Sequence, residues 1–526
     1  MKKYLSLLII PLIFIVYSTA LKKADGPNYN YSLADPSYVY LLNSLTMSEL
    51  EGSGHTDHPG TPLQIAGAFI VKSYFYISHE KDNITEDVIY RPEAYLRVFD
   101  YSLIVLNAIG LLISGLIMFF IFKNIFAGMI FQTIPFISIN VIEVFSLVKT
   151  ENFAFFLILI QITLIIKYIF DHDSDTKKYY LYFSGLICGI ILSAKISFIC
   201  IVFLPLIVFP GFRQKMIFAI TMIASFVISV IPVLSNMEYF INWISNLFIH
   251  NGRYGSGDST VINKSEFFNN ILKIISNEKF FFFSYIFLSG SALIVFFKRD
   301  KLKEIFSSKE MKLCTAIFFA MSINILMVAK HYSSRYMFPA LLLSVPALFV
   351  SVNILRRIYF KKLGVRFIYA GILLFLILFG FYNGRKQLAK SNHIRSECSK
   401  LVEFLNTNYK GASEILSPGV TSEKAALIFA YYYTPDKSRA VLSKYLDQRF
   451  PGLFWYDVFN QKLILFNGKY ESIDMTADKY PLIYRTTDEN YNVTFIRDYE
   501  KLFKERNLKL TKIFSNDNGE LIYKIE

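Results

Sequence analysis

Six ionisable residues of types that suit acid–base or phosphate chemistry are spread over the first two thirds of the chain. They are Asp35, Glu151, Lys195, Arg253, His331 and Arg335. A carboxylate can take a proton from a hydroxyl group when it lies within hydrogen-bond reach. Lysine and arginine side chains bind phosphate groups through charge-assisted hydrogen bonds. If folding gathers these residues in one place, they suit a reaction that activates an acceptor and stabilises a phosphate leaving group.

The composition predicts which elements position these residues. The chain has 526 residues, of which 54% are hydrophobic and only 18% charged, and its mean hydropathy is +0.39. Such values indicate an integral membrane protein with several spans. The net charge of +14 is concentrated in short loops such as 298–312 and 356–366, as in cytoplasmic loops. No soluble segment carries a basic stripe with interleaved aromatic residues, so nucleic acid is not an expected partner.

Apolar stretches long enough to span a bilayer need about 20 residues. They occur at 4–20, 101–122, 125–145, 152–170, 215–234, 280–297, 312–329, 335–355 and 366–382. As one helix, segment 179–210 would be about 48 Å long, too long for one span. Two short helices that meet near Lys195 keep the basic loops cytoplasmic. This gives about 11 spans with the amino terminus inside. The first stretch follows Lys2 and Lys3, and we interpret it as an uncleaved span, with a signal peptide as the alternative.

This assignment of spans predicts a mainly α, polytopic protein of the cell (plasma or inner) membrane. The segments that lie outside are 21–100, 146–151, 235–279, the break at Lys195, the turn at 330–335 and the tail. All six ionisable residues therefore share the extracytoplasmic face. We expect two domains: a transmembrane catalytic domain, 1–383, whose external loop 21–100 carries interfacial helices, and an extracytoplasmic domain, 384–526. The tail alternates apolar and polar residues at 463–466, 493–496 and 521–523, which is typical of a soluble α/β or α+β domain.

The first external loop offers a base and a metal-binding motif. Asp35 follows the first span and suits a general base, although Asp35 followed by Pro36 also suits a helix cap. His55, Asp57 and His58, with Asp35, are candidate ligands for a divalent metal. The alternative for this second motif is a polar loop that leads into a proline turn.

Three later segments carry candidate substrate contacts. Lys195 would sit at membrane depth, where a charged side chain marks a functional site by default, unless it reaches the interface along its stem. Segment 250–258 is rich in glycine and contains Arg253 and Tyr254, in either a substrate-gripping loop or a flexible turn. His331, Arg335 and Tyr336 open a late span on the outer side, and cations there run against the positive-inside bias.

Taken in order, these motifs resemble those of the GT-C superfamily of glycosyltransferases over about residues 1–380, in particular bacterial protein O-mannosyltransferase-like and aminoarabinose transferase-like enzymes. The matching positions are Asp35 in 34–38, Thr61-Pro62-Leu63-Gln64, Arg97, Glu151, Lys195 and Arg335-Tyr336-Met337-Phe338-Pro339. Glu151 stands where that family more often has aspartate, and Glu143 is a nearby alternative for this second acid.

The resemblance implies a GT-C-like helical bundle and transfer of a monosaccharide, with inversion, from a polyprenyl-phosphate-linked donor. The acceptor would be a glycan, lipid or protein of the cell envelope. A divalent metal is the one cofactor to consider. The alternatives are a polysaccharide polymerase or ligase and a lipid or solute transporter. The catalytic candidates are Asp35 and Glu151. The candidate substrate contacts, some from the motifs and some from the external loops, are His58, Arg97, Lys195, Arg253, Tyr254, His331, Arg335 and Tyr336.

Overall fold

The computed structural model describes most of the chain. The described residues are 2–31, 37–56, 59–171, 177–250, 263–297, 308–359, 364–451, 454–457, 462–465, 482–498, 500, 504, 507 and 509–526. Five residues singled out from the sequence lie outside these ranges, namely Asp35, Asp57, His58, Arg253 and Tyr254.

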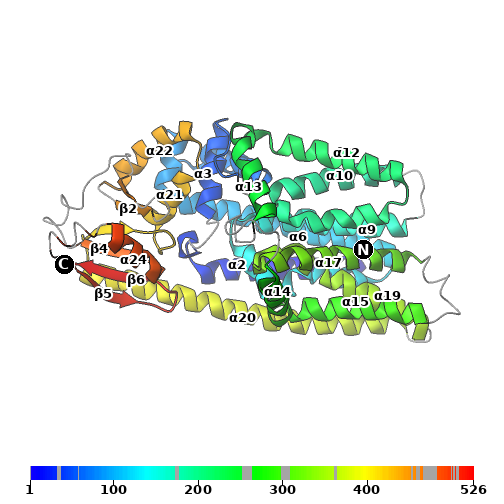
Figure 1. Ribbon diagram of the computed structural model, residues 1–526. Coiled ribbons are helices and arrows are strands. Elements are labelled where there is room, and N and C mark those ends of the chain that lie inside the picture. Colours follow the sequence, from blue (N-terminus) through cyan, green and yellow to red (C-terminus); the bar gives the residue numbers. More distant parts are fainter. Residues whose placement is uncertain are drawn as a thin grey trace.

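Within these ranges, eight helical segments are long and apolar enough to cross a membrane. They contain α2 (Ile9–Asp25), α6 (Pro92–Phe122), α9 (Thr150–Phe170), α12 (Phe212–Ser229), α15 (Lys279–Phe297), α17 (Lys309–Lys330), α19 (Ser344–Tyr359) and α20 (Val365–Asn408). Short helical pieces precede two of them: α1 (Lys2–Leu5) and η1 (Ser6–Leu8) before α2, and η9 (Ser334–Met337) and α18 (Phe338–Leu341) before α19. The long helices run side by side (Figure 1). Large apolar side chains such as Ile220 and Ile223 are exposed on the outside of the bundle, where lipid would cover them. The prediction of a polytopic helical membrane protein is confirmed.

The predicted break at Lys195 is also confirmed. Helix α10 (Lys177–Ala194) ends there, Lys195 has an extended backbone with φ −159° and ψ 114°, and the chain continues as η5 (Ile196–Val202) and α11 (Phe203–Val208). A single helix over 125–145 is wrong. The chain forms α7 (Ile125–Gln132), η3 (Ile134–Phe136), α8 (Ile139–Ile142) and η4 (Glu143–Ser146). Pro135 lacks the N–H that a continuous helix needs. The total of 11 spans remains a prediction.

Shorter helices gather at the end of the bundle that faces the C-terminal sheet. They are η2 (Asn28–Tyr31), α3 (Ser37–Ser48), α4 (Thr61–Ser78), α5 (Ile84–Tyr90), η6 (Ile231–Asn236), α13 (Met237–Ile249) and α14 (Lys264–Asn277). Figure 1 shows α13 and α14 running across the long helices. Every residue of α3 is buried, because α3 packs between α4 and the C-terminal helix α21 (Glu423–Tyr432). By contrast, α4 exposes Phe69 and Ile77, as an interfacial helix would.

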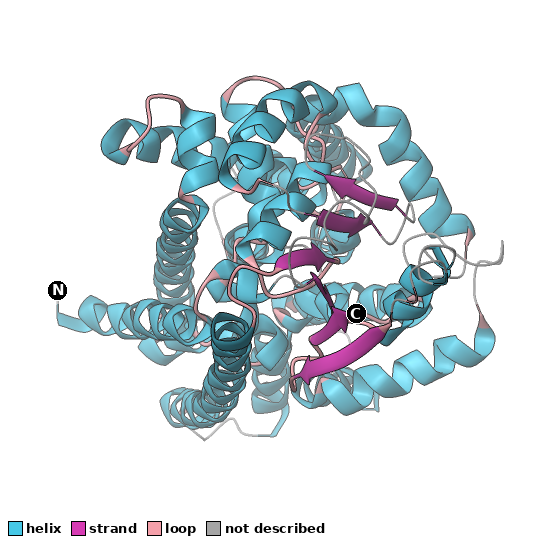
Figure 2. Ribbon diagram, turned by 90° about the vertical axis from the view of Figure 1, so that its left-hand side faces the viewer, coloured by secondary structure: helices cyan, strands magenta, loops and turns pink. Residues whose placement is uncertain are grey.

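The tail forms a six-stranded mixed sheet in the order β3-β2-β1-β4-β6-β5. Strand β1 (Ser413–Leu416) pairs in parallel with β2 (Phe454–Asp457) and β4 (Leu482–Thr486). The antiparallel pairs are β2 with β3 (Lys462–Leu465), β4 with β6 (Leu521–Ile525), and β6 with β5 (Leu510–Ser515). Helices α21, α22 (Asp436–Arg449) and α24 (Glu489–Asp498) accompany the sheet. Viewed from this side, the strands lie across the ends of the bundle helices (Figure 2). The tail is therefore an α/β unit, as predicted.

A buried arginine joins three segments of this unit. Arg485 on β4 contacts Glu520 at 2.6 Å and Glu414 at 2.8 Å, and it donates to the carbonyl of Thr421. Burial alone would raise the pKa of Glu414, but the charges of Arg485 and Lys424 outweigh it and hold this pKa below its ordinary value. The buried charges are thus paired, which their removal from water requires.

The C-terminal unit packs directly on loop 21–100, which follows the first span. A Cβ atom added to Gly54 would lie 2.4 Å from the backbone of Thr434, so the two backbones touch. Ser438 at the start of α22 donates a hydrogen bond to Glu51, and Arg449 at its end donates to the carbonyl of Ile89. The loop that follows the first span is therefore enclosed between the bundle and the tail.

The predicted orientation can be tested with introduced thiols. We expect Glu489→Cys to react with a membrane-impermeant maleimide in intact cells and Lys178→Cys to react only after permeabilisation, because the two exposed residues lie on opposite sides of the threaded membrane. The four native cysteines are buried, so the wild-type chain serves as the unlabelled control. Labelling of Lys178→Cys from outside would contradict the threading.

Candidate active site

A buried ion pair lies where α9 begins and α10 ends. The Lys195 Nζ is 2.7 Å from the Glu151 Oε1, and the two side chains are only 2% and 4% exposed. Glu151 lies in the first turn of α9, and Lys195 follows the last residue of α10. The Thr150 hydroxyl donates to the other carboxylate oxygen of Glu151 at 3.1 Å. Buried charges are tolerated when they are paired in this way, so the pair fixes the position of the ammonium group.

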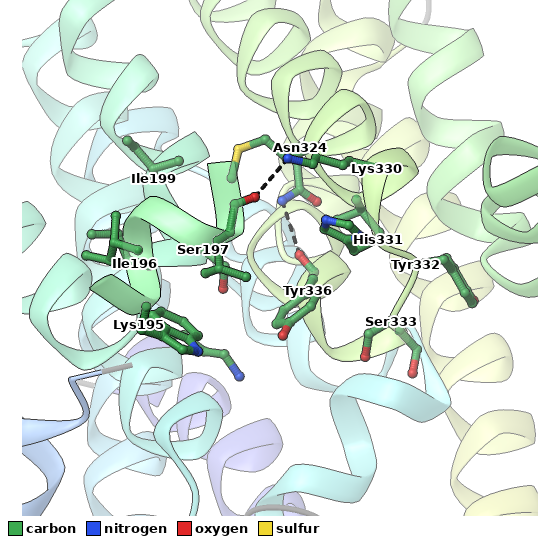
Figure 3. A pocket seen from close by; sticks show the side chains of 16 residues that line it. Lys195, Ile196, Ser197, Ile199, Asn324, Lys330, His331, Tyr332, Ser333 and Tyr336 are labelled. Atoms are coloured by element: carbon green, nitrogen blue, oxygen red, sulfur yellow. Dashed lines mark hydrogen bonds between the residues drawn. The ribbon is translucent and has the colours of Figure 1, made fainter. Parts of the chain in front are cut away.

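A cavity of about 460 Å³ adjoins this pair. Its size is within the range of small-molecule sites. Figure 3 shows Lys195, Asn324, His331 and Tyr336 among the side chains that line it. The lining also includes an apolar set from η5, α13 and α17, which consists of Ile196, Ile199, Trp243, Ile244, Leu247, Met327 and Val328. The cavity therefore combines cationic and aromatic groups with an apolar wall.

Asn324 and Ser197, both in the cavity lining, each carry a buried polar atom without a hydrogen-bond partner among the described residues. Asn324 is fully buried, and its amide nitrogen donates to the carbonyl of Tyr336 at 3.1 Å, while its Oδ1 accepts no hydrogen bond. The buried hydroxyl of Ser197 is in the same situation. Because buried polar atoms are nearly always hydrogen-bonded, these two atoms suit a polar ligand or water.

The turn between α17 and α19 supplies most of the remaining polar lining. Lys330, His331, Tyr332, Ser333, Ser334 and Tyr336 line the cavity. The ring of Tyr336 lies 5.4 Å from the Lys195 ammonium, a cation–π distance. Arg335 lies between two of the lining residues. Lys330 donates to the carbonyl of Leu247 at 2.8 Å and so ties α13 to this turn. The structure thus brings Glu151, Lys195, His331 and Tyr336 together.

The described parts of loop 21–100 are packed against the same helix ends. The Ser37 Oγ accepts a hydrogen bond from the backbone N–H of Val148 at 3.2 Å. The N–H of Gly60 donates to the carbonyl of Ser193 at 3.0 Å. Gly60 has φ +73°, and a Cβ atom there would lie 3.7 Å from Thr150. The loop is therefore fastened beside both members of the ion pair.

Three other candidates lie apart from the cavity. Arg97 is exposed on α6 and does not belong to the lining. His55 is buried, with its ring 5.4 Å from those of Tyr40 and Tyr433, and it is the one metal candidate of the first loop that the structure describes. Glu143 pairs with Lys390 of α20 at 3.0 Å, and the Lys390 side chain is 51% exposed. Of the two alternative acids, Glu151 is the one beside the cavity.

Sequence reasoning did not single out Ser197, Trp243, Asn324, Lys330 or Tyr332. Two of them carried a usable signal. Asn324 is a polar residue inside an apolar span, and Trp243 is one of only two tryptophans in the chain. The others are polar residues at the ends of helices, where such residues are common, so only the folded arrangement distinguishes them.

No protein-family model and no curated protein sequence matches the chain. Among solved structures, the chain is similar to ArnT from Cupriavidus metallidurans bound to undecaprenyl phosphate, with a TM-score of 0.48 and 8% sequence identity. The match covers 98% of this chain and 97% of that one. ArnT is an aminoarabinose transferase of the GT-C type, the type that the sequence motifs resemble.

Proposed function

We propose that the chain is an integral-membrane glycosyltransferase that moves a monosaccharide from a polyprenyl-phosphate-linked donor to an acceptor at the extracytoplasmic face, with inversion at the anomeric carbon. The observation that carries this proposal is the cavity beside the buried Lys195–Glu151 pair, at the ends of the membrane helices. A lipid-borne donor suits a site at the ends of the membrane helices. The tail of the donor can stay in the bilayer while its phosphate contacts cations that the protein holds in place.

The cavity offers the groups that such a donor needs. The cationic side chains of Lys195 and Lys330, with His331, suit the phosphate, and the apolar wall from η5, α13 and α17 suits the first isoprenoid units. The tryptophan and tyrosine rings, the Ser197 hydroxyl and the Asn324 Oδ1 suit a sugar. Negative charge grows on the phosphate oxygen as the glycosidic bond breaks, and a cation held in place stabilises it without reorganising.

In the proposed reaction the acceptor hydroxyl or amine loses its proton to Asp35 and attacks the anomeric carbon. The bond between that carbon and the phosphate oxygen breaks, and polyprenyl phosphate leaves with the electron pair. Glu151 acts by holding Lys195 at the phosphate. The contacts of Ser37 and Gly60 with the segments around Glu151 and Lys195 support a place for the first loop beside the cavity. No step is assigned to a metal.

The donor class separates this proposal from its alternatives. A polymerase or ligase would use a glycan on a lipid diphosphate, and a transporter would release no lipid phosphate. Purified protein should release polyprenyl phosphate from a panel of polyprenyl-phosphate monosaccharides in the presence of a membrane-envelope extract as acceptor source. Release from lipid-diphosphate donors alone would favour a ligase, and flipping of either lipid in vesicles without release would favour transport.

Trp243 provides a binding assay that needs no acceptor. In a Trp455→Phe variant, Trp243 is the single remaining tryptophan, and it lines the cavity. Undecaprenyl phosphate should change its fluorescence in a saturable way, whereas the uncharged polyprenol should bind at least about tenfold more weakly, since it lacks the charge-assisted hydrogen bonds. Equal affinity for the two lipids would contradict a phosphate site. The variant that also carries Trp243→Phe serves as the matched blank.

A further inference from the structure

A second cluster of ligating side chains lies outside the cavity, where α20 meets the last β-hairpin. His393 and Glu397 are one helical turn apart on α20, and Asp517 lies in the turn between β5 and β6. One ligand atom from each of the three side chains lies within 4.8 Å of the others. A nitrogen and two carboxylate oxygens at this spacing can face a common point.

The hairpin turn is held firmly in this position. The N–H of Asp517 donates to the Glu397 Oε2 at 3.2 Å, and the Asn518 side chain donates to the carbonyl of Ile394 at 3.0 Å. Gly519, with φ +82°, closes the turn in a backbone conformation that favours glycine. The three side chains thus come from two elements, α20 and the β5–β6 turn, and Glu397 and Asp517 are 120 positions apart in the chain. Preorganised sites are built on such fixed elements.

We propose that His393, Glu397 and Asp517 bind one divalent transition-metal ion of the zinc class. An imidazole with two carboxylates suits Zn²⁺ or Mn²⁺, whereas Ca²⁺ and Mg²⁺ prefer oxygen ligands alone. The side chains of His393 and Asp517 are 58% and 76% exposed, so an ion can reach the site from solvent and water can complete its coordination. The proposal is independent of the glycosyl transfer proposed above.

The contacts that the three side chains make in this structure predict which neighbouring residues weaken binding of the ion. Glu397 forms an ion pair with Lys400 one turn along the helix, and the His393 Nε2 is 3.6 Å from the Asp517 carboxylate. The ion would replace the proton or hydrogen bond on each ligand atom. Lys400 therefore competes with the ion for Glu397. Binding would cross-link α20 to the β5–β6 hairpin and stabilise the folded C-terminal unit.

The test uses the full chain in detergent, stripped with EDTA and dialysed. Titration with ZnCl₂ in a calorimeter should show one saturable site, and saturation should raise Tm. His393→Gln and Asp517→Asn should each weaken binding by at least about tenfold and abolish the rise in Tm. Lys400→Met should strengthen binding. The exposed His79 of the first external loop offers a matched control, His79→Gln, which should bind zinc as the wild type does.

Several outcomes would overturn the proposal. One is wild-type protein without a saturable zinc site, and another is His393→Gln with unchanged affinity and an unchanged Tm in EDTA, which shows that the variant is folded. A site lost in His58→Gln but kept in His393→Gln would assign the ion to the first external loop instead. Equal affinity for CaCl₂ and ZnCl₂ would rule out the zinc class.

Discussion

Asp35→Asn should lower the rate of sugar transfer by about 10²- to 10⁴-fold, because asparagine cannot take up the proton of the acceptor. Donor binding, followed by Trp243 fluorescence, should stay the same, since the donor phosphate contacts other residues. The measurement is release of polyprenyl phosphate at saturating donor. This change should affect activity alone, because it removes the proton acceptor and leaves the rest of the site intact.

The same variant also tests the competing role of Asp35 as a helix cap. Asparagine caps helices about as well as aspartate does, so a capping role predicts unchanged stability together with unchanged transfer. Asp82→Asn is the matched control, because Asp82 is an exposed aspartate of the same loop, and it should transfer at the wild-type rate. Full activity in Asp35→Asn would refute the general-base assignment.

Lys195→Met should destabilise the protein by about 3–5 kcal/mol, since it leaves the carboxylate of Glu151 buried without its partner. The double variant Lys195→Met/Glu151→Leu should recover most of this loss, because an apolar pair of similar volume often replaces a buried ion pair without cost. Transfer should remain absent in both variants, because the cation for the phosphate is missing. Thermal unfolding and lipid-phosphate release together separate the structural role from the catalytic one.

A second ion pair in the same protein supplies the control. Lys390 and Glu143 are 3.0 Å apart, but the Lys390 side chain is half exposed, so Lys390→Met should cost no more than about 1 kcal/mol and leave transfer intact. Wild-type stability in Lys195→Met would mean that the ion pair is not buried in the folded protein. Transfer restored in the double variant would remove Lys195 from the proposed chemistry.

The helix break at Lys195 could be predicted because two physical limits apply there. Segment 179–210 is too long for one span, and only two short helices keep the later basic loops on the cytoplasmic side. The irregular path over 125–146 was not predicted, because apolar content alone gives no information about the 3-10 turns around Pro135. Residues 493–496 alternate like a strand but belong to α24, near whose start the Asp488 carboxylate accepts the N–H of Asn490 at 2.8 Å. Local capping outweighs a short pattern there.

The candidate site also contains residues that could be predicted from the sequence and residues that could not. Glu151, Lys195, His331 and Tyr336 could be grouped from the sequence, because threading places their segments on one face. Trp243 and Asn324 complete the cavity from α13 and α17, whose contact depends on the packing of segments some 80 positions apart. An apolar helix can pack against its neighbours in several rotations and registers, because lipid and protein neighbours are similarly apolar. The sequence pattern therefore does not determine which polar residue of a span faces the cavity.

Helix α20 fixes both the distance of the C-terminal unit from the bundle and its rotation about the helix axis. Its 44 residues run from the bundle into the sheet without a break, a length of about 66 Å. Each residue of an α-helix adds 1.5 Å and about 100° of rotation. Deleting one residue from its outer part would therefore swing the sheet by about a quarter turn and separate Thr434 from Gly54. Deleting seven would restore the phase but lower the sheet by about 10 Å. An insertion or deletion in this helix therefore both rotates and translates the sheet relative to the bundle, whereas the same change in a flexible linker would alter only its reach.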